Sequence, residues 1–102
     1  MNAEAVFTDD FRADLRAQTR HLIEDDRPDW AERLIEDVEL VGRLLASSPL
    51  AGAMEVERAG RSVRRLVLRK LPFVVWYHWP ERSRKVVVLR LFHVRQSRPI
   101  PK

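Results

Sequence analysis

Apolar side chains recur at two different spacings along this chain, and the change of spacing separates a helical half from a strand half. In the helical half, Thr8 and the two aspartates that follow it are typical of a helix N-terminus. Pro28 ends this first helix or opens a second one, which stops at Ser47, Ser48 and Pro49. The second helix is the stronger prediction, because its apolar residues form one continuous stripe. The stripe consists of Ala31, Leu34, Ile35, Val38, Val41 and Leu45.

The second half of the chain carries three runs of β-branched and aromatic residues, each typical of a strand. These runs span residues 63–70, 73–79 and 86–92, and a polar turn joins the last two. Residues 3–8, before the first helix, could form an additional edge strand. The predicted order is therefore β-α-α-β-β-β. We expect an α+β fold with an N-terminal strand and an α-helical hairpin packed on one face of an antiparallel β-sheet.

The central strand carries bulky side chains on both of its faces. One face presents Phe73, Val75, Tyr77 and Trp79, and the other presents Val74, Trp76 and His78. Two helices normally cover only one face, and fully burying a large side chain is worth roughly 1.5–3 kcal/mol. We therefore expect a second chain to cover part of the other face. The alternative is that the C-terminal tail or a curled edge of the sheet covers it.

The length of 102 residues fits one domain, which we place at residues 1–102, with the tail at 97–102 extended or disordered. The chain has no cysteine, which excludes disulfides, thiolate chemistry and cysteine-based zinc sites. No apolar run reaches the roughly 18 residues that cross a bilayer, and the N-terminus lacks the pattern of a signal peptide. We therefore expect a cytoplasmic protein with no membrane contact, no metal and no cofactor.

The net charge of +4 hides an uneven distribution. Residues 1–50 hold six Arg against twelve Asp or Glu, a net −6, whereas residues 51–102 hold thirteen Lys or Arg against three Glu, a net +10. Because the second half of the chain is so basic, it favours an acidic partner, either a phosphate backbone or an acidic protein segment. The alternative is a solvated basic surface that supports solubility.

A helical hairpin followed by VRRLVLRKLPFVVWY, a polar turn and VVVLRLFHVRQ resembles the RelE/ParE toxin superfamily over nearly the whole chain. The resemblance implies a toxin made beside an antitoxin that neutralises it, with an antitoxin segment that wraps the toxin and occupies surface on the sheet. The features that carry the resemblance are Pro49 and Gly52 after the second helix, Arg64 and Leu66 at a strand entry, Tyr77 ending the aromatic strand, and His93 and Arg95 closing the last strand.

The superfamily has two main activities, since RelE-like members cleave messenger RNA on the ribosome and ParE-like members inhibit DNA gyrase. Metal-free RNA cleavage needs a general acid or base and cations in one cleft. His93, Arg65 and Arg95 are the candidates for those roles, with Arg64 as a further cation. Arg64 and Arg65 are adjacent on a strand and face opposite ways, so at most one lies on the functional face.

Two departures from the RelE-like pattern favour the gyrase inhibitor. RelE-like ribonucleases tend to place an arginine at the position of Val74 and a tyrosine close to the C-terminal end of the last strand. The single tyrosine here, Tyr77, is in mid-sheet, and the LFHVRQ ending is more similar to ParE-like members. The ribosome-dependent ribonuclease is the alternative, and a stand-alone nucleic-acid-binding module is the second alternative.

The expected partners are a cognate antitoxin and DNA gyrase, or the ribosome and mRNA for the ribonuclease. A homodimer is possible but nothing in the sequence requires it. We interpret His21 and Trp30 as ordinary structural residues. The candidates for binding the target or the antitoxin are Arg64, Val74, Trp76, His78, Arg90 and Arg95.

Overall fold

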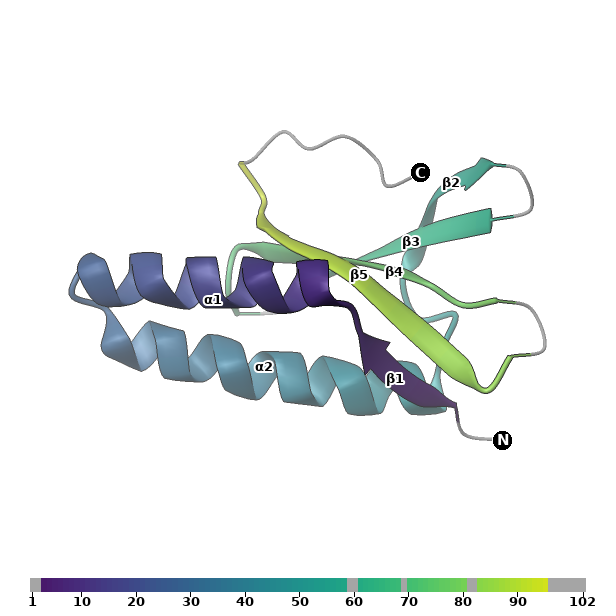
Figure 1. The fold of residues 1–102 in the computed structure, drawn as a ribbon, viewed down its shortest axis with the longest axis horizontal. Helices are drawn as coiled ribbons and strands as arrows, with labels where there is room; N and C mark the ends of the chain where they lie inside the picture. The colour runs from purple at the N-terminus through teal and green to yellow at the C-terminus, as the bar shows by residue number, and fades with distance from the viewer. Residues whose placement is uncertain (1–2, 59–60, 69, 81–82, 96–102) are drawn as a thin grey trace.

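The computed structural model describes residues 3–58, 61–68, 70–80 and 83–95. Within them, one strand and two helices precede four further strands (Figure 1). The elements are β1 (Glu4–Phe7), α1 (Asp9–Glu24), α2 (Pro28–Ser47), β2 (Ala53–Arg58), β3 (Arg61–Val67), β4 (Phe73–His78) and β5 (Lys85–His93). The predicted tail at 97–102 lies outside the described residues. No helix in the described part of the chain is both long enough and apolar enough to span a membrane.

Both helices begin where the sequence predicts. The Thr8 side chain accepts a hydrogen bond from the backbone N–H of Phe11 at 3.1 Å, which caps α1. Pro28 occupies the first turn of α2, where its missing N–H has no intrahelical partner to lose. The short turn between the helices places Asp26 at φ 59°, in the left-handed region.

The five strands form one mixed sheet in the order β1-β5-β4-β3-β2. The predicted α+β class is confirmed, and the structure adds two details. β1 pairs with β5 in parallel, whereas the other strands pair antiparallel. β2, at residues 53–58, is a strand that the sequence did not predict. It pairs with β3, and the register shifts between Met54 and Val56.

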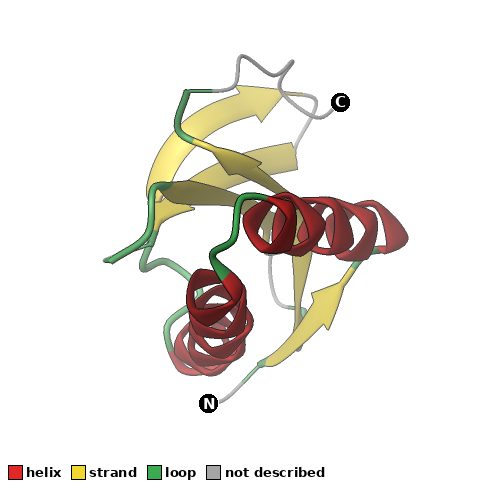
Figure 2. Cartoon of the chain, turned by 90° about the vertical axis from the view of Figure 1, so that its left-hand side faces the viewer, coloured by secondary structure: helices red, strands yellow, loops and turns green. Residues whose placement is uncertain are grey.

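The helical hairpin covers one face of the sheet (Figure 2) and buries the main core. Most residues of the predicted apolar stripe of α2 lie in this core. The exceptions are Ile35, which is exposed, and Ala31, which is buried but does not belong to this cluster. From the sheet it takes the alternate side chains of β4 and β5 that face the helices. These strand residues are Phe73, Val75, Tyr77, Val86, Val88 and Leu91.

The other face of the central strand is buried by the neighbouring strands. Val74 and Trp76 are only 2% and 4% exposed. They pack with Val63 of β3 and with Leu89 and Phe92 of β5, and the Trp76 and Phe92 rings meet edge to face with centroids 4.7 Å apart. The expectation that a second chain covers these two side chains is therefore wrong. The flanking strands carry large apolar groups at the matching positions, and these side chains pack against Val74 and Trp76.

Candidate functional site

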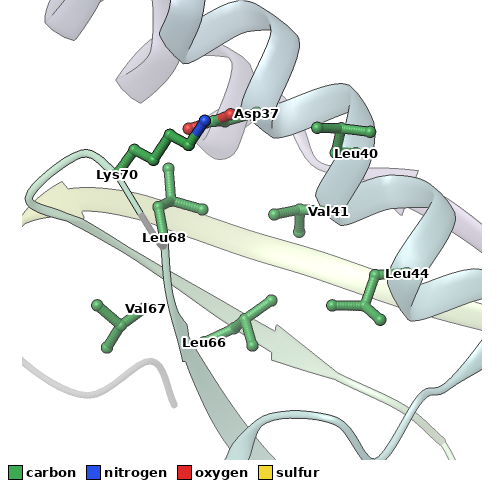
Figure 3. A pocket seen from close by; sticks show the side chains of 8 residues that line it. All are labelled: Asp37, Leu40, Val41, Leu44, Leu66, Val67, Leu68 and Lys70. Atoms are coloured by element: carbon green, nitrogen blue, oxygen red, sulfur yellow. The ribbon is translucent and has the colours of Figure 1, made fainter.

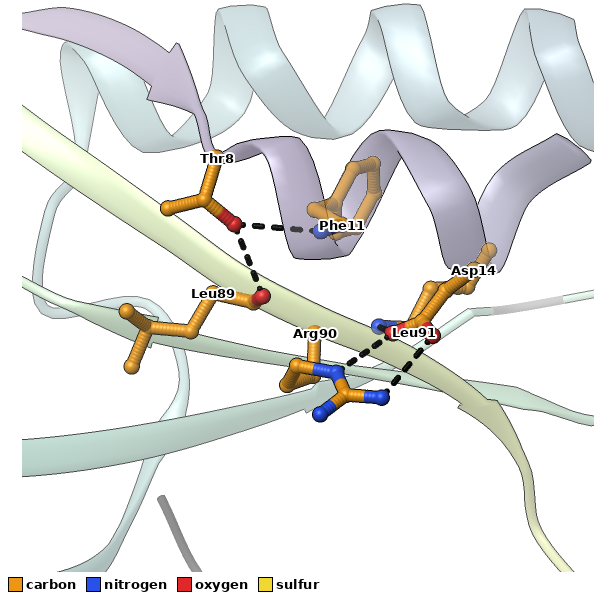
Figure 4. A network of polar contacts seen from close by, with 6 residues as sticks. All are labelled: Thr8, Phe11, Asp14, Leu89, Arg90 and Leu91. Atoms are coloured by element: carbon orange, nitrogen blue, oxygen red, sulfur yellow. Dashed lines mark hydrogen bonds and ion pairs between the residues drawn. The ribbon is translucent and has the colours of Figure 1, made fainter. Parts of the chain in front are cut away.

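A bulge in β5 determines which side chains this strand presents to α1. Across β4, Trp76 pairs with Arg90 and Tyr77 pairs with Val88, so Leu89 has no residue directly opposite it. An extra residue of this kind bends the strand and redirects the side chains beside it. As a result the side chain of Arg90 reaches α1 (Figure 4).

Asp14 of α1 binds both a side chain and the backbone of β5 at this bulge (Figure 4). Arg90 donates from Nε to one carboxylate oxygen at 2.7 Å and from Nη2 to the other at 2.9 Å, and the backbone N–H of Leu91 donates at 3.0 Å. These side-chain hydrogen bonds raise the pKa of Arg90 above its ordinary value. Arg90 was predicted to bind a partner, and in this structure it holds α1 against the sheet.

Thr8 binds two backbone carbonyl groups on the same edge of β5. Its backbone N–H donates to the carbonyl oxygen of Val88 at 3.1 Å, and its hydroxyl donates to the carbonyl oxygen of Leu89 at 3.0 Å (Figure 4). β1 ends at Phe7, so it cannot pair with this part of β5. Thr8 and Asp14 therefore occupy backbone groups that would otherwise form an open sheet edge.

Arg64, another predicted binding residue, is held by the loop before β2. Its Nη1 atom donates to the carbonyl oxygen of Gly52 at 2.8 Å, while the Gly52 N–H donates to the hydroxyl of Tyr77 at 2.8 Å. Burial raises the pKa of Tyr77 above its ordinary value. A Cβ on Gly52 would lie 2.6 Å from the carbonyl oxygen of Arg65, so only glycine fits there. Arg64 and Tyr77 thus fix the loop on the helix side of the sheet.

His93 and Arg65, two candidates for RNA cleavage, lie on opposite faces of the sheet. His93 pairs with Phe73, and the two rings pack edge to face on the helix side with centroids 5.5 Å apart. Arg65 pairs with Trp76, which belongs to the cluster on the other face. Directly paired side chains share a face. The backbone N–H of Arg95 donates to Nδ1 of His93 at 3.1 Å, so the structure brings Arg95 beside His93 and leaves Arg65 away from both.

The remaining predicted binding residues lie on β4. The burial of Val74 and Trp76 leaves little surface for a partner to contact. His78 is half-buried, and its Nδ1 lies 2.7 Å from the carbonyl oxygen of Ser62. Because that carbonyl can only accept, Nδ1 carries a proton and donates. His78 therefore links β4 to β3.

An apolar groove of about 420 Å³ runs between α2 and the end of β3 (Figure 3). We call it the α2–β3 groove. Asp37 and Lys70 lie beside each other at one of its ends. Its lining residues are Asp37, Leu40, Val41, Leu44, Leu66, Val67, Leu68 and Lys70.

Three large apolar side chains in the walls of the α2–β3 groove are exposed to solvent. Leu40 is 55% exposed, Leu44 is 42% exposed and Val67 is 49% exposed. The prediction from sequence missed this surface, although a signal was present. Leu40 and Leu44 each precede a residue of the buried stripe, Val41 and Leu45, and so form a second apolar line that the sheet does not cover.

Comparison with known proteins identifies a family whose sequence pattern matches this chain. The family model described as the ParE toxin of the type II toxin–antitoxin system, parDE, matches residues 5–98. The chain belongs to the ParE toxin family. The resemblance to the RelE/ParE superfamily, with its ParE-like branch favoured, is thereby confirmed. This chain is a toxin of the type II toxin–antitoxin class.

Two solved structures share the fold of this ParE-family toxin. The chromosomal ParDE TA system from P. aeruginosa matches with a TM-score of 0.70 at 24% identity, covering 89% of this chain and 95% of that chain. The toxin–antitoxin complex RelBE2 from Mycobacterium tuberculosis matches with a TM-score of 0.61 at 20% identity, covering 91% and 99%. A search of curated proteins found no match. Within the described residues of the ParE-family chain, no three His, Asp or Glu side chains gather as metal ligands would.

Proposed function

We propose that this ParE-family toxin arrests growth by binding DNA gyrase and does not cut RNA. The observation that carries the proposal is the separation of Arg65 from His93, two of the three candidate catalytic residues. Cleavage of RNA without a metal requires a general base within hydrogen-bond reach of the attacking hydroxyl and a cation beside the same phosphate. His93 and Arg65 cannot meet at one phosphate, because the sheet lies between them.

Two further arginines of the sheet support the same interpretation. Arg90 is engaged by Asp14 in a two-pronged ion pair, and Arg64 binds the carbonyl oxygen of Gly52. Moving either guanidinium onto a phosphate would break contacts that hold α1 or the loop before β2. A toxin that acts by occupying a surface of its target needs no such rearrangement.

We further propose that the α2–β3 groove receives the antitoxin. The two solved relatives are toxin–antitoxin systems by their titles, which makes an antitoxin the expected occupant. The exposed leucines and valine of the α2–β3 groove favour an amphipathic segment of the antitoxin, with apolar side chains at helical or alternate spacing. Asp37 and Lys70 at one end favour a partner that offers both a basic and an acidic side chain there.

Two assays on the purified chain separate gyrase binding from RNA cleavage. In the first, we expect increasing amounts of toxin to block the supercoiling of relaxed plasmid by purified gyrase. In the second, we expect the toxin to leave messenger RNA intact in a translating extract, as judged by mapping of 5′ ends. Cuts in mRNA at the ribosomal A site, with gyrase unaffected, would assign the chain to the ribonuclease alternative.

The groove is tested by a matched pair of substitutions on α2. Leu40→Lys introduces a charge into the groove, whereas Ile35→Lys introduces the same charge at an exposed apolar position of the same helix outside it. We expect both variants to arrest growth when expressed alone. Co-expression of the antitoxin gene should rescue cells that carry Ile35→Lys but not cells that carry Leu40→Lys. Equal rescue of both would refute the assignment of the groove.

A further inference from the structure

Three arginines lie in one line along the solvent-facing side of α1. Arg12, Arg16 and Arg20 follow one another at intervals of four residues, which places them on one face of the helix. All three are exposed, and α1 packs on α2 and β5 through its other side. We call these three residues the α1 ridge. It presents a strip of positive charge that extends about 12 Å along the helix axis.

No carboxylate of the described residues pairs with the α1 ridge. Asp14 follows Arg12 by two positions, but it is buried and pairs with Arg90 of β5. Within the described part of the chain, neither an ion pair nor a hydrogen bond engages the guanidinium of Arg12, Arg16 or Arg20. The N–H donors of the three side chains are therefore available to a partner.

The exposed arginines of α2 have a different arrangement, which is the one typical of a solvated helix. Arg33 lies four residues from both Asp29 and Asp37. Arg43 lies four residues after Glu39. Opposite charges at this spacing stabilise a helix, whereas like charges destabilise it. The middle residue of the α1 ridge has an arginine on both sides at this spacing, so the ridge weakens its own helix. A local conflict of this kind is expected at a functional surface.

Negative charges bound the α1 ridge at both ends. Asp9 lies one turn before Arg12, and Glu24 lies one turn after Arg20. Residues 1–50 as a whole carry six Arg against twelve Asp or Glu, a net −6. A nucleic-acid backbone is negative along its whole length, so its phosphates beyond the ridge would meet like charges. A protein helix can instead place acidic side chains over the ridge and basic ones beyond it.

The surface beside the α1 ridge can accommodate a helix. Ala13 and Ala17 are exposed and lie four residues apart along one side of the ridge. Side chains this small allow the axis of a second helix to come close. Ile23 follows the last arginine of the ridge by three residues and is 59% exposed. It offers an apolar contact at the C-terminal end of the ridge.

We propose that the α1 ridge binds an acidic helix of gyrase. The partner helix carries carboxylates at positions i, i+4 and i+8, each bound by one guanidinium, and an apolar side chain beside Ile23. The inference rests on the proposed function, because it takes gyrase as the partner. The antitoxin is a weaker candidate for this surface, because no residue of α1 lines the α2–β3 groove that we assign to it.

Two double variants with the same change of charge test the α1 ridge. Arg12→Gln/Arg16→Gln removes two charges from the ridge. Arg33→Gln/Arg43→Gln removes two charges from exposed positions of α2 that do not line the α2–β3 groove. We expect the ridge variant to need at least about tenfold more protein for half-inhibition of gyrase supercoiling, and the α2 variant to inhibit as the parent chain does. Glutamine is nearly as good a helix former as arginine, so both variants should keep the circular dichroism spectrum of the parent.

The outcomes separate this inference from the proposed function. A parent chain that leaves gyrase active would refute the proposed function itself. A parent chain that inhibits gyrase no better than the ridge variant would refute the role of the ridge and leave the proposed function standing. The nucleic-acid alternative is tested with a short DNA duplex in the absence of gyrase. Tight binding of the duplex by the parent and by the α2 variant, but not by the ridge variant, would assign the ridge to a phosphate backbone and overturn the inference.

Discussion

Replacing Asp14 with alanine removes the acceptor that joins α1 to the bulge of β5. Two consequences follow from the structure. The backbone N–H of Leu91, a residue with no exposed surface, loses its acceptor. Arg90 loses both hydrogen bonds to the carboxylate, but its side chain is 31% exposed and water can solvate it.

These two effects differ in size. A buried donor left without a partner costs about 1–3 kcal/mol. A partly exposed ion pair contributes only about 0.2–1 kcal/mol, because solvent screens it. We therefore expect Asp14→Ala to lower the free energy of unfolding by about 1–4 kcal/mol, a large part of the roughly 5–15 kcal/mol that stabilises a small domain. Urea denaturation followed by far-ultraviolet circular dichroism measures this change.

A double-mutant cycle tests the reasoning more strictly. Arg90→Ala should cost only about 1 kcal/mol, since water then reaches the carboxylate and the Leu91 hydrogen bond remains. Once Asp14 has been removed, Arg90 has no carboxylate to bind at this position. The double variant should therefore be about as stable as Asp14→Ala alone. Losses that simply add would show that Arg90 contributes independently of Asp14. An Arg90→Ala variant as unstable as Asp14→Ala would show that the backbone hydrogen bond is not the main contribution.

Three further results are expected. The pKa of Tyr77 is raised above 10.0, so the unfolded chain loses this proton first. The contribution of Tyr77 to stability should therefore be constant below pH 10 and should fall above it. Tyrosinate absorbance reports the ionisation directly, because Tyr77 is the single tyrosine. Gly52→Ala should lower the urea midpoint by the equivalent of about 1–3 kcal/mol, whereas Gly42→Ala, whose Cβ would lie 3.2 Å from the edge of a phenylalanine ring, should change it little. Arg65→Gln and His93→Gln should still arrest growth on induced expression, and loss of arrest in both would favour the ribonuclease.

The sequence predicted the helices well because their signals are local. Thr8 caps α1 through a residue three positions away, and Pro28 opens α2 by its own geometry. The class of fold followed from the order of the segments. β2 was missed because its residues carry charges at several positions and its pairing with β3 is irregular, so no alternating pattern marks it.

The roles of individual side chains were harder to predict because they depend on distant partners. Arg90 binds Asp14 across 76 positions of sequence, and a bulge in the strand brings the two together. Periodicity places residues on faces but does not reveal bulges. For the same reason Trp76 looked uncovered in the sequence. Its cover comes from Leu89 and Phe92 on a neighbouring strand, whose contribution depends on the register.

The position of β5 between β1 and β4 has a consequence for how the chain matures. β5 is the last described strand to leave the ribosome, yet it is the one that receives β1, Thr8 and Asp14 from the opposite end of the sequence. Until it is made, β1 lacks its strand partner and α1 lacks its anchor. Contacts of such long sequence separation form slowly. The nascent toxin therefore has an interval between synthesis and a completed sheet, during which a neutralising protein has time to meet it.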